Sequence, residues 1–287
     1  MLSILIPVFN YDCSLLVRAV HSQVSALGIP FEILCFDDCS TSKSVNIKGL
    51  SELIHVKHQY MATNQGRSRI RNLLAATARY DNLLFLDCDS MPADNDFIKR
   101  YIDCIGSADC ICGGTIYNDK STIQRTQTLH WTYGTRREMK AARSQNSFMA
   151  NNFFIKRNVF MDIGFDTDIQ GYGHEDTIFG ITLLSKGYGL LLIENPVFHL
   201  GLNNTDIFLD NTRSAVINLR KLYDNQSYKR VISSIRLVKI YNRLSILRIA
   251  SVLRCLRPVL LPLLTHQLRS RHPYMLFLDL YKLLWFC

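Results

Sequence analysis

Short apolar runs alternate with longer amphipathic stretches over the first hundred residues of the chain. The amphipathic stretches Ser14–Leu27 and Gly66–Tyr80 place apolar residues at helical spacing and predict helices. The apolar runs predict strands, the third of them weak, at Leu2–Val8, Phe31–Phe36, Leu53–Val56 and Leu83–Leu86. This βαβαβαβ order indicates an α/β fold with a mostly parallel sheet, right-handed crossovers and helices on both faces.

The pattern loosens beyond residue 107. Ala108–Tyr117 predicts a strand, and Gly113-Gly114 inside it indicates a bulge or a close approach of two backbones. Further helices are predicted over Ser121–Arg143 and Asp176–Lys186, and further strands over Phe153–Lys156 and Leu190–Glu194. From about residue 206 the sequence becomes helical and basic.

Acidic residues gather where the predicted strands end. Asp37 and Asp38 follow the second strand, and Asp87-Cys88-Asp89 follows the fourth. Since ligands of parallel sheets bind at the carboxyl ends of the strands, two carboxylate pairs there concentrate charge that a divalent cation would neutralise. The carboxylates of a D-x-D suit Mg²⁺ or Mn²⁺, which keep positions open for phosphate oxygens. A D-x-D can also be a solvated turn, but its place after an apolar strand favours the metal.

Charged residues also stand at two predicted helix starts. Arg67, Arg69 and Arg71 oppose the helix dipole, so they are either solvated beside acidic neighbours or contact an anion; we favour diphosphate contact for Arg71. In Gly171-Tyr172-Gly173-His174-Glu175-Asp176 one carboxylate complements the dipole, and the other is a candidate general base. His199 follows an apolar strand and is either a structural histidine or a further metal ligand.

Length and composition exclude several classes of protein. The chain has 287 residues, of which 48% are apolar and 20% charged, so it is neither disordered nor fibrous. No window of about 18 uncharged apolar residues occurs, and we therefore expect no membrane-spanning helix. The N-terminus lacks the basic lead-in and cleavage site of a signal peptide. Nine cysteines without a C-x-x-C pair favour reduced thiols and a cytoplasmic location.

The net charge of +9 is unevenly distributed. Residues 213–287 hold 14 Lys+Arg and 2 Asp+Glu, a net of +12, whereas the other 212 residues hold 19 and 22, a net of −3. A basic segment beside a weakly acidic body favours an anionic partner, which is either a membrane surface or a nucleic acid. The chain has no G-x-G-x-x-G, P-loop, H-E-x-x-H or G-x-S-x-G motif, which disfavours dinucleotide enzymes, P-loop enzymes, zincins and hydrolases.

Several ordered blocks resemble the GT-A-fold glycosyltransferases of family 2, over about two-thirds of the chain from Leu2 to Gly201. The blocks are SILIPVFN, FDDCS, NQGRSRIRN, FLDCD, GFD, GYGHED and VFHLG. The resemblance implies a Rossmann-like, mixed and mostly parallel sheet flanked by helices. It also implies a role for individual residues: nucleotide binding by Pro7, Phe9, Asp37 or Asp38, Asn64, Arg71 and Asp87; metal binding by Asp89 and His199; general base catalysis by Asp176; and acceptor contact by Glu175 and Tyr172.

The function implied by this resemblance is inverting transfer of a sugar from a nucleoside-diphosphate donor, a UDP-sugar by expectation, with Mn²⁺ or Mg²⁺ as cofactor. The expected acceptor is a hydroxyl of a glycan or lipid-linked saccharide in surface polysaccharide synthesis. An alternative is a catalytically silent module that binds a nucleotide sugar or glycan. A binder has no need of a base, so the joint presence of Asp89, Asp176 and His199 favours the enzyme.

Residues 213–287 are predicted to form a basic amphipathic helical extension to a GT-A domain at 1–212, which divides into a nucleotide-binding half (1–107) and an acceptor half (108–212). On one helical wheel, Arg236, Lys239, Arg243, Arg254 and Arg257 fall within about a 60° arc. Pro258 and Pro262 are expected to break that helix. Basic, aliphatic and aromatic residues together favour a peripheral anchor on the inner face of the cell membrane over a packed cap. Nucleic acid is disfavoured because the aromatics stand among aliphatics.

Overall fold

The structure, a computed structural model, describes residues 1–41, 48–50, 52–141, 148–169 and 171–287. It divides the chain into two compact units. The first unit comprises Met1–Asn118, Arg137–Asp168 and Glu175–Gly201, and the second comprises Asp119–Arg136, Ile169–His174 and Leu202–Cys287. The predicted boundary between residues 212 and 213 falls inside one helix of the second unit, α8 (Thr205–Asp224).

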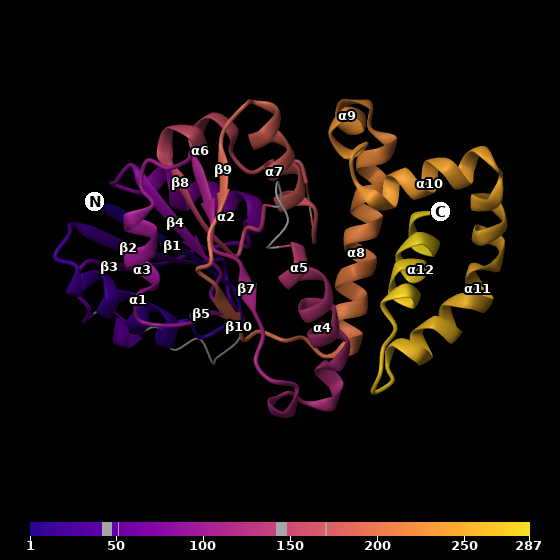
Figure 1. Cartoon of the computed structure of the whole chain (residues 1–287), viewed down its shortest axis with the longest axis horizontal. Helices are drawn as coiled ribbons and strands as arrows, with labels where there is room; N and C mark the ends of the chain where they lie inside the picture. The colour runs from indigo at the N-terminus through magenta and orange to yellow at the C-terminus, as the bar shows by residue number, and fades with distance from the viewer. Residues whose placement is uncertain (42–47, 51, 142–147, 170) are drawn as a thin grey trace. The chain divides into compact units, whose positions relative to one another are not determined.

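A seven-stranded sheet runs through the first unit (Figure 1). Its strand order is β3 (Val56–Tyr60), β2 (Phe31–Asp37), β1 (Leu2–Val8), β4 (Asn82–Leu86), β8 (Asn152–Lys156), β6 (Cys110–Cys112) and β9 (Leu190–Leu192). β1 pairs in parallel with β2 and β4, whereas β8 is antiparallel to β4 and β6. This arrangement confirms the predicted α/β class with a mixed, mostly parallel sheet.

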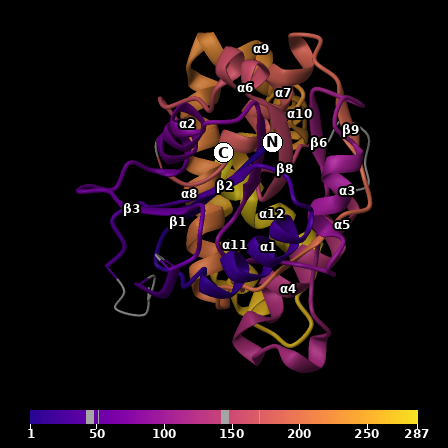
Figure 2. The same ribbon diagram turned by 90° about the vertical axis from the view of Figure 1, so that its left-hand side faces the viewer.

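Helices cover both faces of this sheet (Figure 2). One core contains Leu2, Ile4 and Ile6 of β1 together with buried residues of α1 (Ser14–Ala26) and α3 (Phe97–Asp103). The other core contains Leu5 of β1 together with residues of α2 (Arg67–Thr77), α6 (Arg157–Ile163) and α7 (Glu175–Ser185). Because successive strand residues point to opposite faces, a fully apolar β1 fits a strand that is buried on both sides.

A second, three-stranded sheet of the first unit joins distant parts of the chain. β10 (Val197–His199) lies between β5 (Ser90–Pro92) and β7 (Thr115–Ile116). It pairs antiparallel with β5, which sets His199 opposite Ser90. The pairing therefore brings the residues that follow β4 next to those near position 200.

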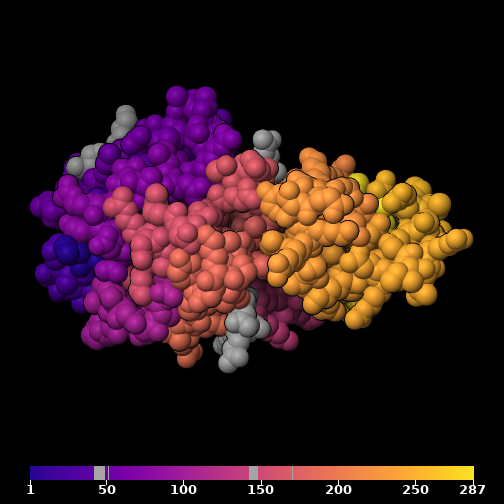
Figure 3. Space-filling model, turned by 90° about the horizontal axis from the view of Figure 1, so that it is seen from above, coloured from indigo at the N-terminus to yellow at the C-terminus, as the bar shows by residue number. Residues whose placement is uncertain are grey.

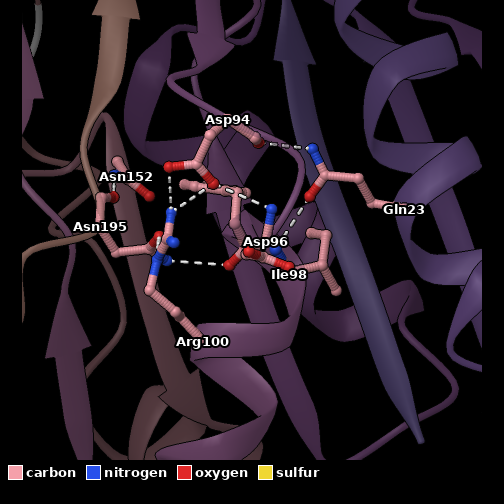
Figure 4. Close-up of polar contacts among 8 residues, drawn as sticks. Gln23, Asp94, Asp96, Ile98, Arg100, Asn152 and Asn195 are labelled. Atoms are coloured by element: carbon pink, nitrogen blue, oxygen red, sulfur yellow. Dashed lines mark hydrogen bonds and ion pairs between the residues drawn. The ribbon is translucent and has the colours of Figure 1, made fainter.

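Arg100 of α3 ties together the segments that flank β5 and β10 (Figure 4). Its Nη2 donates to Asp94 at 2.7 Å, just after β5, and its Nε donates to the Asn195 Oδ1 at 2.7 Å, just before β10. Gln23 of α1 holds the same turn, since its Nε2 donates to the Asp94 carbonyl and its Oε1 accepts from the Ile98 N–H. These bonds fix one end of the β5–β10 pair, the end where Pro92 lies opposite Val197.

Asn152 links this cluster to the large sheet. Its Oδ1 accepts from the Tyr101 hydroxyl at 2.7 Å, and its Nδ2 donates to the carbonyls of Gly114 and Asn195 at 2.9 Å each. The backbones are so close here that a Cβ on Gly113 would lie 2.3 Å from the Asn195 carbonyl oxygen. This crowding confirms the close approach predicted at the glycine pair, and the predicted strand divides there into β6 and β7.

Some predicted elements are wrong in position or type. The third strand begins at Val56 rather than Leu53, and the described residues between β2 and β3 contain the 3₁₀ turn η1 (Lys48–Leu50) but no α-helix. Residues 121–143 were predicted as mostly helix, and residues 142 and 143 lie outside the described part. The remainder is a series of short helical pieces: η2 (Lys120–Thr122), η3 (Arg125–Gln127), α4 (Thr128–Tyr133), the π-helical η4 (Gly134–Glu138) and α5 (Met139–Ala141).

The second unit is helical. Its C-terminal part, Leu202–Cys287, is coloured orange to yellow in Figure 3. Besides α4 and α8, it contains α9 (Lys229–Ile232), α10 (Arg236–Ile246), α11 (Ile249–Leu268) and α12 (Met275–Phe286). Its core joins residues of α4, α8, α11 and α12, among them Leu129, Phe208, Leu264 and Leu284. A helical extension after the α/β part was predicted, and the helices confirm its secondary structure.

Two predictions for this region are wrong. The chain turns between α10 and α11, where Arg248 has a φ of 59°, so the five basic residues of the single wheel lie on two helices. Pro258 and Pro262 lie within α11 and do not end it. A spanning helix was not expected, yet by length and composition α11 could cross a membrane, because Arg254 and Arg257 are the only Lys, Arg, Asp or Glu within it.

Replacement of Asn152 by alanine tests the buried cluster. The change removes three buried side-chain hydrogen bonds, with the Tyr101 hydroxyl and with the carbonyls of Gly114 and Asn195, so we expect the free energy of unfolding to fall by about 2–4 kcal/mol in urea denaturation. Asn82→Ala is the matched control, since Asn82 is half-buried at the start of β4 and makes one bond, to the Met1 carbonyl. It should cost about 1 kcal/mol or less. Equal losses in the two variants would contradict the role given to Asn152.

Candidate functional site

Asp89 and His199 meet at the edge of the small sheet. The Asp89 Oδ2 lies 3.7 Å from the His199 Nε2. The β5–β10 pairing sets this distance, because His199 is opposite Ser90 and the Leu200 N–H donates to the Asp89 carbonyl at 2.8 Å. The Tyr117 ring lies 5.6 Å from the imidazole in a stacked arrangement and limits its rotation. The two predicted metal ligands are therefore brought together from distant parts of the sequence.

Gly201 leaves the room that the Asp89 side chain occupies. A Cβ at this position would lie 2.0 Å from the Asp89 Oδ2 and 2.8 Å from its Cγ. Any other residue would therefore push the carboxylate out of its place. Sequence reasoning did not single out Gly201, although it stands two residues after His199 in the VFHLG block.

This pair can hold a divalent cation. Burial raises the pKa of the Asp89 carboxyl, the nearby His199 opposes the rise, and Asp87 adds to it. A dication would offset that cost of burying a carboxylate. Among the described residues no group of three or more His, Cys, Asp or Glu side chains is placed to hold a metal. A site with one carboxylate and one imidazole suits Mg²⁺ or Mn²⁺, which take further ligands from water and phosphate oxygens.

Asp87, the other carboxylate of the D-x-D, pairs with Arg71. The Arg71 Nη2 lies 2.6 Å from the Asp87 Oδ1, and the guanidinium carbon is 5.3 Å from the centre of the Phe165 ring. Arg71 is buried, whereas the Asp87 side chain is 32% exposed, so solvent reaches the pair from the carboxylate side. Cys88 between the two aspartates is an unreactive thiol, because burial and Asp89 raise its pKa far above the ordinary value.

Asp38 holds the start of α2. Its two carboxylate oxygens accept from the backbone N–H groups of Gln65 at 2.5 Å and Gly66 at 2.9 Å. The side-chain amide of Asn64 donates to the Asp38 carbonyl at 3.0 Å. These contacts support the loop that leads into the arginine-bearing helix, while the nucleotide roles predicted for Asp38 and Asn64 stay predictions.

Asp37 and Asp38 differ in the hydrogen bonds that their carboxylate oxygens accept. The Asp37 Oδ1 accepts from the Ser40 N–H at 2.7 Å. Its Oδ2 is buried and has no hydrogen-bond partner among the described residues. Of the two aspartates after β2, Asp37 is therefore the better candidate acceptor for a donor group on a nucleotide base or ribose.

The acidic pair at the start of α7 lies beside α2. The Glu175 Oε1 is 3.6 Å from the Arg67 Nη1. The Asp176 Oδ1 accepts from the Thr177 N–H at 2.6 Å. Burial and the neighbouring Glu175 raise the pKa of the Asp176 carboxyl to about 6, and Arg71 acts in the opposite direction. Such a carboxyl loses its proton near neutral pH and can then accept one from a substrate.

The remaining predicted residues lie at several places. Pro7 is in β1 opposite Phe36, and the Phe9 side chain just past the strand is 50% exposed. Tyr11 was not predicted as a site residue. Burial raises the pKa of its phenol, and the charge of Asp89 raises it further, so the phenol lies near the D-x-D. Tyr172 belongs to the second unit, where its carbonyl accepts from the Asn218 amide at 3.1 Å. Its acceptor role stays a prediction.

Comparison with known proteins identifies the family. Residues 3–164 match the family described as Glycosyl transferase family 2. Two Haemophilus influenzae proteins, each described as an uncharacterized glycosyltransferase, are 32% identical over 104 residues and 36% identical over 107. These matches cover 35% and 36% of this chain and 40% and 35% of the relatives, so the chain spans well under half of their length. The chain belongs to glycosyl transferase family 2.

Solved structures share the fold. The mannosyltransferase PcManGT from Pyrobaculum calidifontis, in complex with GDP-Man and Mn²⁺, superposes with a TM-score of 0.58 at 12% identity, over 89% of this chain and 74% of that one. TarS 1-349 from S. aureus, in complex with UDP-GlcNAc, has a TM-score of 0.51 at 16% identity, over 98% and 89% of the two chains. The predicted GT-A fold is thereby confirmed.

Replacement of Gly201 by alanine tests the space around Asp89. The added methyl group displaces the carboxylate, so we expect Mn²⁺ affinity, measured by titration calorimetry in the presence of UDP, to fall roughly 10–100-fold. Gly189→Ala is the control, because a Cβ there meets no atom closer than 3.7 Å. Circular dichroism and urea denaturation should show both variants folded. Unchanged affinity in a folded Gly201→Ala protein would contradict this description of the site.

Proposed function

We propose that this protein is a metal-dependent inverting glycosyltransferase that moves a hexosyl-type sugar from a nucleoside-diphosphate donor to an acceptor hydroxyl. The observation that carries the proposal is the approach of Asp89 and His199 to 3.7 Å at the end of the small sheet. Membership of glycosyl transferase family 2 supports the same reaction class. The raised pKa of Asp176 supplies the second requirement, a base that works near neutral pH.

Asp89 and His199 would hold the cation, and Mn²⁺ or Mg²⁺ would supply positive charge to the diphosphate leaving group. Arg71, whose own side chain is buried, adds a fixed positive charge beside Asp87. Such charge matters because the diphosphate becomes more negative as its bond to the sugar breaks. PcManGT has been solved with GDP-Man and Mn²⁺, which supports this donor chemistry.

The nucleotide would lie along the carboxyl ends of β1 and β2. Asp37 offers its buried Oδ2 to an N–H or O–H of the base or ribose. Pro7 and the exposed ring of Phe9 supply apolar surface next to it. Asp38 and Asn64 would support nucleotide binding indirectly, because their hydrogen bonds hold the loop at the start of α2. We propose a UDP-sugar as donor, which the structure of TarS with UDP-GlcNAc supports.

Asp176 would act on the acceptor. The acceptor oxygen forms a bond to the anomeric carbon from the face opposite the leaving group, as the bond from that carbon to the phosphate oxygen breaks. The hydroxyl proton passes to the Asp176 carboxylate, and the configuration at the anomeric carbon is inverted. Glu175 keeps the pKa of Asp176 high enough for this transfer and, together with Tyr172, is proposed to contact the acceptor, a glycan or lipid-linked saccharide of a surface polysaccharide.

A module that only binds nucleotide sugars is the competing hypothesis. Such a module needs the cation and nucleotide contacts but gains nothing from a half-buried carboxyl with a pKa near 6. The placement of Asp176 next to Glu175 at the start of α7 therefore favours the enzyme. A panel of nucleotide sugars, assayed for hydrolysis and transfer with and without Mn²⁺, separates the two hypotheses and names the donor.

Asp176→Asn tests the base directly. Asparagine keeps the side-chain oxygen that accepts from the Thr177 N–H but cannot take up a proton, so we expect transfer to fall about 10²–10⁴-fold. UDP-sugar affinity, measured by calorimetry, should stay within about twofold of the unchanged protein. Asp103→Asn, on the surface of α3, is the matched control and should transfer normally. Near-normal transfer by Asp176→Asn would overturn the assignment.

The pH dependence of kcat/KM tests the environment of the base. At saturating Mn²⁺, kcat/KM should fall as the pH drops through about 6, because protonated Asp176 cannot accept the acceptor proton. Glu175→Gln removes the negative neighbour that helps to raise the pKa, so the midpoint should move to lower pH. A midpoint that does not move in this variant, or an activity that does not fall below pH 6, would contradict the role of the pair.

A further inference from the structure

The exposed side of α11 carries an apolar stripe. Its members recur every three or four residues, and their exposed fractions are 39%, 56%, 45%, 62% and 64% for Ile249, Val252, Leu256, Val259 and Leu263. We call these five residues the α11 stripe. Ile246 and Leu247, just before the helix, are 81% and 67% exposed. Apolar side chains gathered on one face of a protein mark a surface that another body covers.

The other side of α11 is also apolar, and the second unit already uses it. Ala250, Leu264 and Leu268 are buried, and the two leucines pack into the core with Leu278 and Leu284 of α12. A helix of a water-soluble unit normally pairs one apolar face with one polar face. The α11 stripe therefore leaves about half of its side-chain surface outside the packing of its own unit.

The segment that contains the stripe carries positive charge and no negative charge in its sequence. Residues 225–278 contain ten Lys+Arg and no Asp or Glu. Exposed cations near the stripe in sequence are Arg236, Lys239 and Arg243 of α10, Arg248 at the turn into α11 and Arg254 within α11. Exposed aliphatic residues together with cations that have no acidic neighbours in sequence are complementary to a partner with an apolar interior and an anionic surface.

We propose that the α11 stripe and the cations of α10 bind the surface of an anionic lipid bilayer. A second copy of this chain is a poorer occupant, because a symmetric contact would bring two such cationic segments together without a carboxylate between them. A bilayer offers both complements at once, acyl chains for the stripe and anionic headgroups for the cations. The proposal uses no residue of the metal or base site, and it adds a lipid surface to the proposed function.

The helix lies in the plane of the interface in this proposal. Arg254 donates from its Nε to the Cys287 carbonyl at 2.6 Å, and the Arg257 guanidinium lies 5.2 Å from the Trp285 ring centre. Both arginines thereby connect α11 to the end of α12. A helix that crossed the bilayer would lose these contacts and carry two cations into hydrocarbon, whereas a helix at the interface keeps them.

Flotation with vesicles tests the proposal. The whole chain is mixed with vesicles of phosphatidylcholine that contain 30% phosphatidylglycerol, or of phosphatidylcholine alone, at about 50 mM and 500 mM salt. We expect flotation with the anionic vesicles at low salt, at least a tenfold decrease in bound protein at high salt, and little flotation with neutral vesicles. Absence of flotation with anionic vesicles at low salt would overturn the proposal.

Two variants and a control separate the parts of the surface. Leu256→Gln/Val259→Gln changes two of the five stripe residues, and Arg236→Gln/Lys239→Gln/Arg243→Gln removes the cations of α10. Each should lower binding to anionic vesicles at least tenfold, whereas Ile207→Gln/Leu276→Gln, which changes exposed apolar residues outside the stripe, should bind normally. Equal loss in the control, or a dimer in sedimentation analysis that the stripe variant dissociates, would overturn the proposal. Mn²⁺-dependent hydrolysis of UDP-sugar without lipid should stay unchanged in all three, so a failure of the enzyme assignment is recognised separately.

Discussion

The antiparallel pairing of β5 with β10 is the constraint on which the site depends. It sets His199 opposite Ser90 and so brings the imidazole to the carboxylate of Asp89. Three-residue strands contribute few hydrogen bonds of their own, and the pairing is supported at the end away from His199 by Arg100, which bonds to Asp94 beyond β5 and to Asn195 before β10. Asn152 and the absent side chain of Gly113 connect that support to the large sheet. The geometry of a two-residue site is thus maintained by buried polar contacts one layer away.

The two halves of the proposed chemistry are connected through α2. Arg71 pairs with Asp87 beside the cation site, and the same guanidinium lowers the pKa of Asp176 at the base site. Arg67, one helical turn earlier, lies 3.6 Å from Glu175. Arginines at the start of a helix are unfavourable there, and the surrounding carboxylates offset the cost. A change at Arg71 should therefore alter both leaving-group stabilisation and proton transfer.

The sequence predicted the centre of the fold well, because long apolar runs and clear helical periodicity mark buried elements. β1, β2 and β4 and the helices α1 and α2 lie within a few residues of their predicted bounds. β10 was not predicted as a strand, since three residues carry no periodicity and its order comes from pairing with β5 and β7. The turn at Arg248 and the passage of α11 through two prolines depend on tertiary packing that local patterns do not contain.

For the site, the sequence identified the charged groups but not the residues that place them. Asp89, His199, Arg71 and Asp176 were found because strand ends and helix starts concentrate charge. Gly201 and Arg100 were not identified. The role of a glycine that leaves space, and of an arginine that links two loops, depends on neighbours that only the folded structure shows. The VFHLG block could have drawn attention to the glycine, since it follows the histidine so closely.

Electron spin-echo spectroscopy of bound Mn²⁺ tests the central claim most directly. With the unchanged protein and UDP, modulation from a directly coordinated imidazole nitrogen should be present, and it should vanish in His199→Gln while nucleotide binding remains. A Mn²⁺ signal without nitrogen modulation, or one that His199→Gln leaves intact, would contradict a cation site built from Asp89 and His199.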